Sequence, residues 1–323
     1  MSPWLAISTL MERARAAIEA GTALVVVLYS PEIELGWEGT TMTDMTGKVV
    51  IVTGGAGGFG RAFTRAFLES GAKVAAFDVT DEGLAALKDE HHGVNEDRLI
   101  TEKVDIADFA SCQAAVDRVA DRFGGVHVLI NNAGLGMGSV REGHHVDLIG
   151  IDEVTPEIWN HMVGVNLTGP WNMTKASIGY LRKAGGARVI NVTTSFFTML
   201  RGKFQPYGPS KSGFESMSAG HAAEFEADGI TVNVVVPGGP ADTPMVAEDS
   251  GFARADLVQP ENMTYPAMWL CSPEGEGMTG NRYIAGRWDP EKSVEENRAA
   301  TESPIAWPDL AGDPVWPGGR PDE

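Results

Sequence analysis

Short runs of consecutive apolar residues alternate with stretches of helical periodicity along most of this chain. Continuous apolar runs that end in glycine or aspartate are typical of strands buried on both faces of a parallel sheet. Strands that alternate with helices predict an α/β fold, with a doubly wound parallel sheet in a single domain. The predicted strands are 49–52, 73–77, 99–104, 126–130, 188–192 and 230–236, and the predicted helices are 61–70, 110–123, 156–165 and 207–227.

The two ends of the chain lack this alternation. Residues 1–44 are expected to be an N-terminal extension, either an oligomer contact or lid, or the product of a start codon assigned too early. Residues 289–323 carry six prolines, which argues against long regular elements. This tail also contains Trp307 and Trp316, so we expect part of it to pack on a surface. The predicted main domain is therefore 45–288.

Charge and cysteine content restrict the partners. The 323 residues include 44 acidic side chains against 25 Lys and Arg, a net charge of −19, which argues against nucleic acid or an anionic membrane as partner. More than half of the acidic excess lies in the two terminal segments, so it says little about a substrate. Only Cys112 and Cys271 are present, which favours a reducing compartment. Without a bilayer-length apolar run or a signal-peptide pattern, we expect a soluble, cytoplasmic protein.

A glycine-rich run, Thr-Gly-Gly-Ala-Gly-Gly-Phe-Gly at 53–60, follows the first predicted strand and opens a helix. Glycines permit positive φ and let backbone N–H groups approach a pyrophosphate at the N-terminus of that helix. Tight turns alone also explain such glycines, but the strand before them and the helix after them favour a nucleotide site. The residues expected to line it include Gly54, Gly58, Phe59 and Gly60.

Asp78 closes the second predicted strand, 24 positions after Gly54, and Val79 follows it. A carboxylate at this place accepts hydrogen bonds from both ribose hydroxyls of NAD and repels the 2′-phosphate of NADP. No Lys or Arg adjoins Asp78 to receive that phosphate, so the sequence favours NAD over NADP. The alternative is a solvated aspartate at the end of a strand.

Tyr207 and Lys211 lie four positions apart, which places them on one face of a predicted helix. A nearby ammonium favours tyrosinate, so we expect Lys211 to lower the pKa of Tyr207 toward the working range of an acid–base catalyst. This spacing occurs often by chance. Its place after a strand and a hydroxyl-rich turn, Thr193-Thr194-Ser195, makes it specific.

Further motifs follow in the same order over about 48–288, namely Asp105-Ile106, Asn131-Asn132-Ala133-Gly134, Asn166 and Pro237-Gly238. With these motifs the chain resembles the short-chain dehydrogenase/reductase family. The resemblance implies a Rossmann-type fold, a nicotinamide cofactor, and hydride transfer between an alcohol and a ketone. It also implies a homo-dimer or homo-tetramer.

The resemblance also implies the roles of individual residues. Tyr207 is the general acid in reduction and the base in oxidation, and Lys211 lowers its pKa and binds the nicotinamide ribose. Ser195 hydrogen-bonds the substrate oxygen, and Asn166 holds a water that relays protons to Lys211. The implied cofactor contacts are Gly54, Gly58, Phe59, Gly60, Asp78, Val79, Asp105, Ile106, Asn132, Ala133, Gly134, Tyr207, Lys211, Pro237 and Gly238.

Two positions depart from the family pattern. The family serine lies 13 residues before the tyrosine, whereas Ser195 lies 12 before Tyr207 and Thr194 lies 13 before it. We expect Ser195 to be the catalytic hydroxyl, with the one-residue difference taken up by a shift in the loop 196–206. Thr194 is the alternative, because a threonine hydroxyl donates and accepts hydrogen bonds as a serine hydroxyl does. Pro240 stands where a backbone N–H of the family meets the nicotinamide carboxamide, and Ala241 would have to replace it.

The segment 135–153 is long and contains Arg141, His144 and His145. We expect it to be a solvated or substrate-facing loop and not a metal site, since adjacent histidines seldom converge on one ion and no zinc spacing occurs. The apolar side chains after Ser195, at 196, 197 and 199, either wall a substrate pocket or pack on the sheet.

The expected activity is NAD-dependent interconversion of a secondary alcohol and a ketone whose body is apolar or cyclic. The alternatives are a regulator that binds the cofactor without turnover, and a dehydratase or epimerase that recycles bound NAD.

Overall fold

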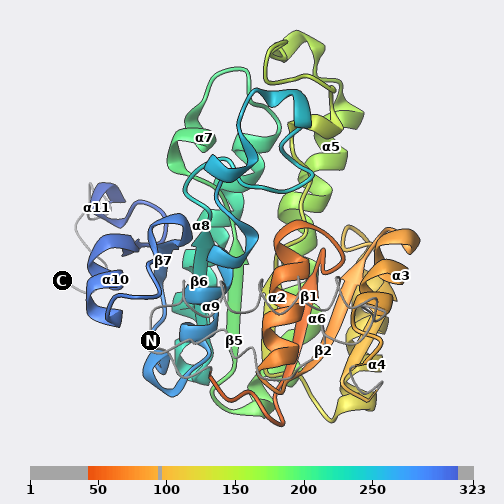
Figure 1. The fold of residues 1–323 in the computed structure, drawn as a ribbon, viewed down its shortest axis with the longest axis vertical. Coiled ribbons are helices and arrows are strands. Elements are labelled where there is room, and N and C mark those ends of the chain that lie inside the picture. The colour runs from red at the N-terminus through yellow and green to blue at the C-terminus, as the bar shows by residue number, and fades with distance from the viewer. Residues whose placement is uncertain (1–42, 94–96, 312–323) are drawn as a thin grey trace, which may run out of the picture. The chain divides into compact units, whose positions relative to one another are not determined.

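The computed structural model describes residues 43–93 and 97–311. Within these residues, eight strands form one sheet in the order β3-β2-β1-β4-β5-β6-β7-β8 (Figure 1). The predicted α/β doubly wound sheet of Rossmann type is confirmed. The strands are β1 Val49–Thr53, β2 Lys73–Asp78, β3 Leu99–Lys103, β4 Val128–Asn131, β5 Arg188–Val192, β6 Thr231–Val236, β7 Asn281–Ile284 and β8 Glu302–Pro304.

The first seven strands are parallel, and β8 pairs antiparallel to β7. The strand order reverses direction beside β1, which pairs with both β2 and β4. In open parallel sheets the crevice at such a reversal, outside the carboxyl ends of the strands, is where ligands bind. The glycine-rich loop leaves β1 at this end of the sheet.

Helices cover both faces of the sheet (Figure 1). Apolar side chains of α4, α6 and α8 form one buried cluster with the sheet, and those of α2 and α9 form a second cluster on the other face. The helices are α2 Gly58–Glu69, α3 Asp81–Glu90, α4 Phe109–Phe123, α5 Pro156–Val163, α6 Gly169–Ala184, α7 Phe196–Leu200, α8 Tyr207–Phe225, α9 Thr264–Leu270, α10 Val294–Thr301 and α11 Pro308–Ala311.

Burial explains which strands the sequence predicts. Every residue of β1, β4 and β6 is buried, so each of these strands reads as an unbroken apolar run or nearly so. The strand β7 has the sequence Asn-Arg-Tyr-Ile and contains a buried arginine, so the apolar pattern does not predict it. Helix α9 is also missing from the prediction, since it spans seven residues with a proline among them.

The predicted helix that begins after Thr155 does form, and the Thr155 hydroxyl accepts a hydrogen bond from the Ile158 N–H. This helix, α5, continues into α6 through a π-helical turn over Gly164–Thr168, which holds the buried Asn166. Turns of this kind inside helices are frequent at functional sites because the extra residue re-aims a side chain.

The sheet continues past residue 288. Helix α10 begins at a capping box in which Ser293 and Glu296 exchange hydrogen bonds, and β8 follows it at the sheet edge. Ile305 is buried against Val234 and Val236 of β6. Part of the tail thus packs on the sheet, as its tryptophan content predicts. The N-terminal extension predicted for 1–44 lies almost wholly outside the described residues.

Candidate active site

The glycine-rich loop approaches its neighbours too closely for any side chain. Gly54 has φ +62°, and a Cβ on Gly60 would lie 1.9 Å from the Gly54 carbonyl oxygen. Gly57 is the N-cap of helix α2 and offers no side-chain cap, and the first turn holds no acidic residue. An added Cβ on Gly57 would meet no atom within 4 Å. Uncapped N–H groups that face open space fit a pyrophosphate.

Asp78 stands beside this loop. Its Oδ2 accepts a hydrogen bond from the Ala56 N–H at 3.2 Å, and its Oδ1 accepts bonds from the N–H groups of Val79 and Thr80. The Thr80 hydroxyl adds a further bond at 2.9 Å. The carboxylate is therefore fixed in orientation at the end of β2, next to the turn where the predicted ribose contact is needed.

The end of β4 is tied to the same loop. The Thr53 hydroxyl accepts bonds from the N–H groups of Asn132 and Ala133, both at 3.0 Å. The Asn132 amide in turn donates to the carbonyls of Thr53 and Gly54. Gly134 follows, and a Cβ there would lie 3.3 Å from both the Lys211 Nζ and the Asn166 Oδ1. The predicted cofactor residues of β1 and β4 thus adjoin two of the predicted catalytic residues.

Hydrogen bonds from α6 hold the Asp105-Ile106 turn in place. The Asn172 amide of α6 donates to the Ile106 and Ala107 carbonyls, and the Asp105 carboxylate accepts from the Ala107 N–H. Ile106 is buried and Asp105 is exposed. This leaves the Asp105 side chain exposed to solvent while the turn that carries it is held against α6.

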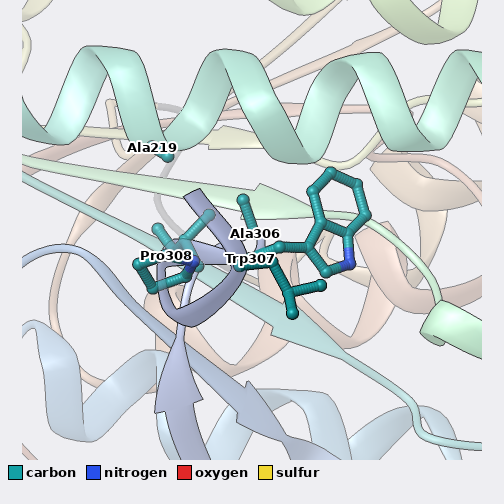
Figure 2. A pocket seen from close by; sticks show the side chains of 6 residues that line it. Ala219, Ala306, Trp307 and Pro308 are labelled. Atoms are coloured by element: carbon teal, nitrogen blue, oxygen red, sulfur yellow. The ribbon is translucent and has the colours of Figure 1, made fainter. Parts of the chain in front are cut away.

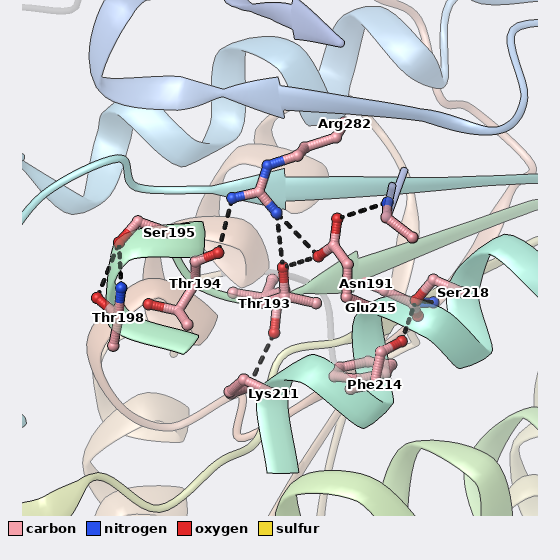
Figure 3. Close-up of polar contacts among 12 residues, drawn as sticks. Asn191, Thr193, Thr194, Ser195, Thr198, Lys211, Phe214, Glu215, Ser218 and Arg282 are labelled. Carbon is pink, nitrogen blue, oxygen red and sulfur yellow. Dashed lines mark hydrogen bonds and ion pairs between the residues drawn. The ribbon is translucent and has the colours of Figure 1, made fainter. Parts of the chain in front are cut away.

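Tyr207 is the first residue of α8, and its side chain is half-buried. Burial raises the pKa of its hydroxyl, and a hydrogen bond with the Thr194 side chain opposes that rise. The expectation that Lys211 lowers this pKa is corrected here. Desolvation is the larger influence, and the Lys211 Nζ donates to the Val192 carbonyl at 2.9 Å (Figure 3).

The structure separates the two candidate hydroxyls. The Ser195 Oγ caps α7, where it accepts a bond from the Thr198 N–H and lies 2.8 Å from the Thr198 hydroxyl (Figure 3). Thr194 is buried, and its side chain, unlike that of Ser195, acts on the pKa of the Tyr207 hydroxyl and lowers it. Geometry therefore favours the alternative, Thr194, over the preferred Ser195 as the hydroxyl nearest to the tyrosine.

Lys211 is buried, and burial lowers the pKa of its ammonium to about 8, with Glu215 opposing the shift. Asn166 lies close by. Its amide donates to the Leu135 carbonyl and to the Ser210 hydroxyl, and its Oδ1 accepts from the Leu135 N–H at 2.7 Å. These bonds fix Asn166 against the segment that follows Gly134, and both Asn166 and Lys211 adjoin Gly134.

We predict a stability signature for the buried ammonium. A lysine with a folded pKa of about 8 and an ordinary value of 10.5 destabilises the fold while it is charged, and the penalty fades as pH rises above 8. Relative to Lys211→Met, the unfolding free energy of the wild type should rise by up to about 3 kcal/mol between pH 7 and pH 10.5. Urea unfolding of both proteins across this range measures the difference. A difference that does not change with pH would contradict the burial of a charged Lys211.

The segment after β6 covers the site. The Pro237 carbonyl accepts from the Gly286 N–H, and a Cβ on Gly58 would lie 3.3 Å from the Thr243 side chain. Ala241 forms a parallel bridge with Val258. The Asp242 N–H donates to the Val258 carbonyl, and the Val258 N–H donates to the Pro240 carbonyl. The Ala241 N–H therefore points away from Val258.

Aromatic side chains adjoin Tyr207 on one side. The Phe204 ring meets the Tyr207 ring edge-on at 5.7 Å, and the His144 ring lies 6.3 Å from Phe204. Burial is the main cause that lowers the pKa of His144. The segment 135–153 thus reaches the neighbourhood of Tyr207 through His144.

The apolar residues after Ser195 do not form a common wall. Phe196 packs on Arg282 and Trp307, Phe197 is 75% exposed, and Met199 is buried. Phe204 adjoins Tyr207 instead, and its place three residues before the tyrosine is the sequence signal that could have found it.

The described part of the chain holds neither a cluster of metal-ligating side chains nor a helix that could span a membrane. No group of three or more His, Cys, Asp or Glu side chains in residues 43–93 and 97–311 could hold a metal ion. Over the same residues, no helix has the length and apolarity needed to cross a bilayer.

Comparisons with known proteins agree with this geometry. A family model described as short chain dehydrogenase matches residues 48–252. The chain is 32% identical over 254 residues to 2,5-dichloro-2,5-cyclohexadiene-1,4-diol dehydrogenase LinX of Sphingobium indicum, an alignment that covers 76% of this chain and 97% of that enzyme.

Solved structures show the same likeness. A 3-ketoacyl-(acyl-carrier-protein) reductase from Brucella melitensis, complexed with NADH, is 27% identical with a TM-score of 0.64, over 73% of this chain and 95% of the other. A blue fluorescent protein from a metagenomic library, in complex with NADPH, is 29% identical with a TM-score of 0.64, over 73% and 95%. The fold, the order of the motifs along it and these likenesses show that the chain belongs to the short-chain dehydrogenase/reductase family and is an oxidoreductase that acts on alcohols.

Proposed function

We propose that this protein interconverts a secondary alcohol and a ketone by hydride transfer with NAD, with Tyr207 as the acid–base residue. One observation carries the proposal. The Thr194 side chain opposes the rise that burial causes in the pKa of the Tyr207 hydroxyl, and the buried Lys211 follows one turn later on α8. A pure cofactor sensor has no use for this group of proton-transfer side chains beside a nucleotide crevice.

The residues divide the work as follows. When bound, a nicotinamide dinucleotide supplies the hydride acceptor in oxidation and the hydride donor in reduction. Tyr207 removes the hydroxyl proton of the alcohol, or returns it to the ketone oxygen. Thr194 donates a hydrogen bond that steadies charge on the substrate oxygen and on the tyrosinate. Lys211 adds positive charge on the same helix face, and Asn166 fixes the backbone beside it.

Cofactor selection rests on Asp78. Its carboxylate is held at the end of β2 by Ala56 and Thr80, so it cannot turn away from a 2′-phosphate without losing four hydrogen bonds. A 2′-phosphate would place a second negative charge beside the Asp78 carboxylate, which is costly. The two hydroxyls of an unmodified ribose instead donate hydrogen bonds to that carboxylate. We therefore propose NAD as the preferred cofactor. At the other end, Ala241 offers the N–H that Pro240 lacks.

This choice gives a cofactor prediction. In Asp78→Ala, kcat/KM with NAD⁺ should fall by about tenfold to a hundredfold, because hydrogen bonds to a charged acceptor are lost. The value with NADP⁺ should rise at the same time. Asp89→Ala, which removes an exposed carboxylate of α3, is the matched control and should leave the ratio unchanged. Initial rates with both cofactors measure it, and an unchanged ratio in Asp78→Ala would contradict the assignment.

The substrate body is proposed to be apolar and cyclic. Phe204 lies edge-on to Tyr207, and Leu135 and Val140 belong to the same apolar cluster around Met137. Flat or alicyclic rings pack against such surfaces. The similarity to a dehydrogenase named for a cyclohexadiene diol supports this class.

Assembly and compartment are proposed on separate grounds. Both cysteines are free thiols, which suits the cytoplasm. Phe109 and Trp171 are exposed and lie 6.5 Å apart on α4 and α6, and an exposed aromatic pair favours burial against another copy as a homo-dimer or homo-tetramer. Small-molecule alcohols are the proposed substrates, without nucleic acid or membrane as partner.

An absorbance screen at 340 nm tests the proposal. Purified protein with NAD⁺ and a panel of cyclic secondary alcohols should produce reduced cofactor. Cofactor-dependent binding of a protein partner without turnover would point to a regulator. Cofactor that copurifies tightly and is never released in reduced form would point to a dehydratase or epimerase.

A further inference from the structure

A buried ion pair lies next to the Thr193-Thr194-Ser195 turn. Arg282 of β7 and Glu215 of α8 are 4% and 0% exposed, and Arg282 Nη1 donates to Glu215 Oε2 at 2.8 Å. Neither residue belongs to the family motifs of the sequence analysis, and neither is predicted from sequence. Burying two charges is expensive, so a pair of this kind calls for a role beyond packing.

The pair is bonded directly to the catalytic loop. Arg282 Nη2 donates to the Thr194 carbonyl at 2.7 Å, and the Thr193 hydroxyl donates to Glu215 Oε2 at 2.6 Å (Figure 3). The planar guanidinium thus bridges the carboxylate and the peptide that carries the Thr194 side chain. A fork with fixed geometry orients what it binds better than a flexible ammonium does.

The C-terminal segment closes this arrangement from outside. The Ala306 N–H donates to Glu215 Oε1 at 3.3 Å, and Ala306 holds φ +61°, a conformation that costs a non-glycine residue about 1–2 kcal/mol. The Phe196 ring is sandwiched between the Arg282 guanidinium, at 4.1 Å, and the Trp307 ring, at 5.7 Å. An unfavourable backbone conformation persists where its surroundings require it.

Trp307 itself lines a shallow apolar groove between Ala219 of α8 and residues 305–310. Figure 2 shows Ala219 of α8 across from the segment that carries Ala306, Trp307 and Pro308. The tail that the sequence sets apart from the main domain therefore reaches the first residue of α7, directly after Ser195.

We propose that Arg282 is a positioning residue that orients Thr194 for catalysis, and that Ala306 and Trp307 of the C-terminal segment hold Arg282 and Phe196 in place. This inference rests on the proposed function for its catalytic part. Without the bond from Arg282, the Thr194 peptide is free to rotate, and the hydroxyl moves away from Tyr207. Chemistry then slows while cofactor binding, at the far end of the crevice, is untouched.

Steady-state kinetics of Arg282→Lys tests the first half. The lysine keeps a charge for Glu215 but cannot also reach the Thr194 carbonyl in fixed geometry. We expect kcat to fall by about tenfold to a hundredfold, the scale of supporting residues around a site, with KM for NAD⁺ unchanged. A higher KM for NAD⁺ with an unchanged kcat would overturn the inference.

A double-mutant cycle shows whether Arg282 acts through Thr194. In a Thr194→Val background, the Arg282→Lys change should produce little further loss, because the group that it positions is already gone. Losses that multiply independently would contradict a positioning role. The cycle uses only the ratio of kcat between the double variant and Thr194→Val, so the double variant can be slow in absolute terms.

Trp307 variants test the second half and cover the case in which Arg282→Lys fails to fold. Trp307→Ala should lower kcat, and Trp307→Phe, which keeps a ring against Phe196, should recover most of it. Leu310→Ala, an exposed neighbour in α11, is the matched control and should behave as the wild type. Equal kcat in all three variants would contradict the proposal that Trp307 helps to hold Phe196 and Arg282 in place.

Hydrogen exchange separates this inference from the proposed function. Amides of residues 193–199 should exchange faster in Arg282→Lys and Trp307→Ala than in the wild type or Leu310→Ala. If the wild type oxidises no alcohol of the panel, the proposed function fails, and the exchange data still decide the link between tail and loop. If the wild type is active and exchange and kcat are unchanged, the inference fails alone.

Discussion

Replacing Tyr207 with phenylalanine is expected to lower kcat by about 10²- to 10⁴-fold, the contribution of a positioned acid–base group. The substitution removes one oxygen and keeps the ring that meets Phe204 edge-on, so the pocket wall stays intact. Burial of the hydroxyl already opposes its ionisation, so its loss should not destabilise the fold. Stopped-flow and steady-state reduction of NAD⁺ at 340 nm measure the effect.

Tyr180→Phe is the control for this change. Tyr180 of α6 donates to the Asp117 carboxylate at 2.7 Å, away from the crevice, so its loss should leave kcat unchanged. Cofactor binding by Tyr207→Phe, followed by fluorescence titration, should weaken far less than kcat falls, because most of the implied cofactor contacts remain. Activity of Tyr207→Phe within a few fold of the wild type would show that the proton moves by another route.

The second large effect concerns the two adjacent hydroxyls. Thr194→Val should lower kcat by about 10²- to 10³-fold, the scale for removal of one hydrogen-bond donor at a reacting oxygen. Valine matches threonine in shape and keeps the backbone carbonyl that Arg282 contacts. Thr194→Ser retains the hydroxyl and should retain activity.

Ser195→Ala should have the opposite signature. Its hydroxyl accepts the Thr198 N–H at the start of α7, so its loss costs about 1 kcal/mol of stability and little activity. Thermal unfolding and kcat measured on Thr194→Val and Ser195→Ala side by side decide the assignment. A large loss of kcat in Ser195→Ala with an active Thr194→Val would restore the serine.

Apolar patterning predicts most of this fold because the central strands are buried on both faces. The runs at β1 and β6 have no solvent face to interrupt them. The strand β7 escapes prediction because its central residue, Arg282, is a charge whose partner Glu215 is distant in sequence. Long-range pairing that neutralises a buried charge leaves no local signal.

The cofactor crevice is as predictable as the strands that frame it. Gly54 and Asn132 each follow a strand and Asp78 is the last residue of one, and parallel strands bring these ends together. The choice between Thr194 and Ser195 is different, since both follow the same strand and offer the same chemistry. What separates them is that Ser195 caps α7, a helix of five residues too short to predict.

The pKa of Tyr207 shows a further limit of spacing arguments. Four residues place Lys211 on the same helix face, which predicts a lowered value. The degree of burial is a tertiary property, and here desolvation is the main influence on the pKa of Tyr207 and of Lys211. Burial disfavours the charged form of each group, so it raises the pKa of the tyrosine and lowers that of the lysine.

Isotope transfer tests the central claim most directly. The protein is incubated with NAD⁺ and cyclic secondary alcohols deuterated at the carbinol carbon, and the cofactor and products are analysed by mass spectrometry. The account predicts that deuterium appears in the reduced cofactor, that the matching ketone forms, and that Tyr207→Phe suppresses both. Cofactor that binds but never acquires deuterium from any alcohol, or that returns it to form a dehydrated or epimerised product, would contradict the account.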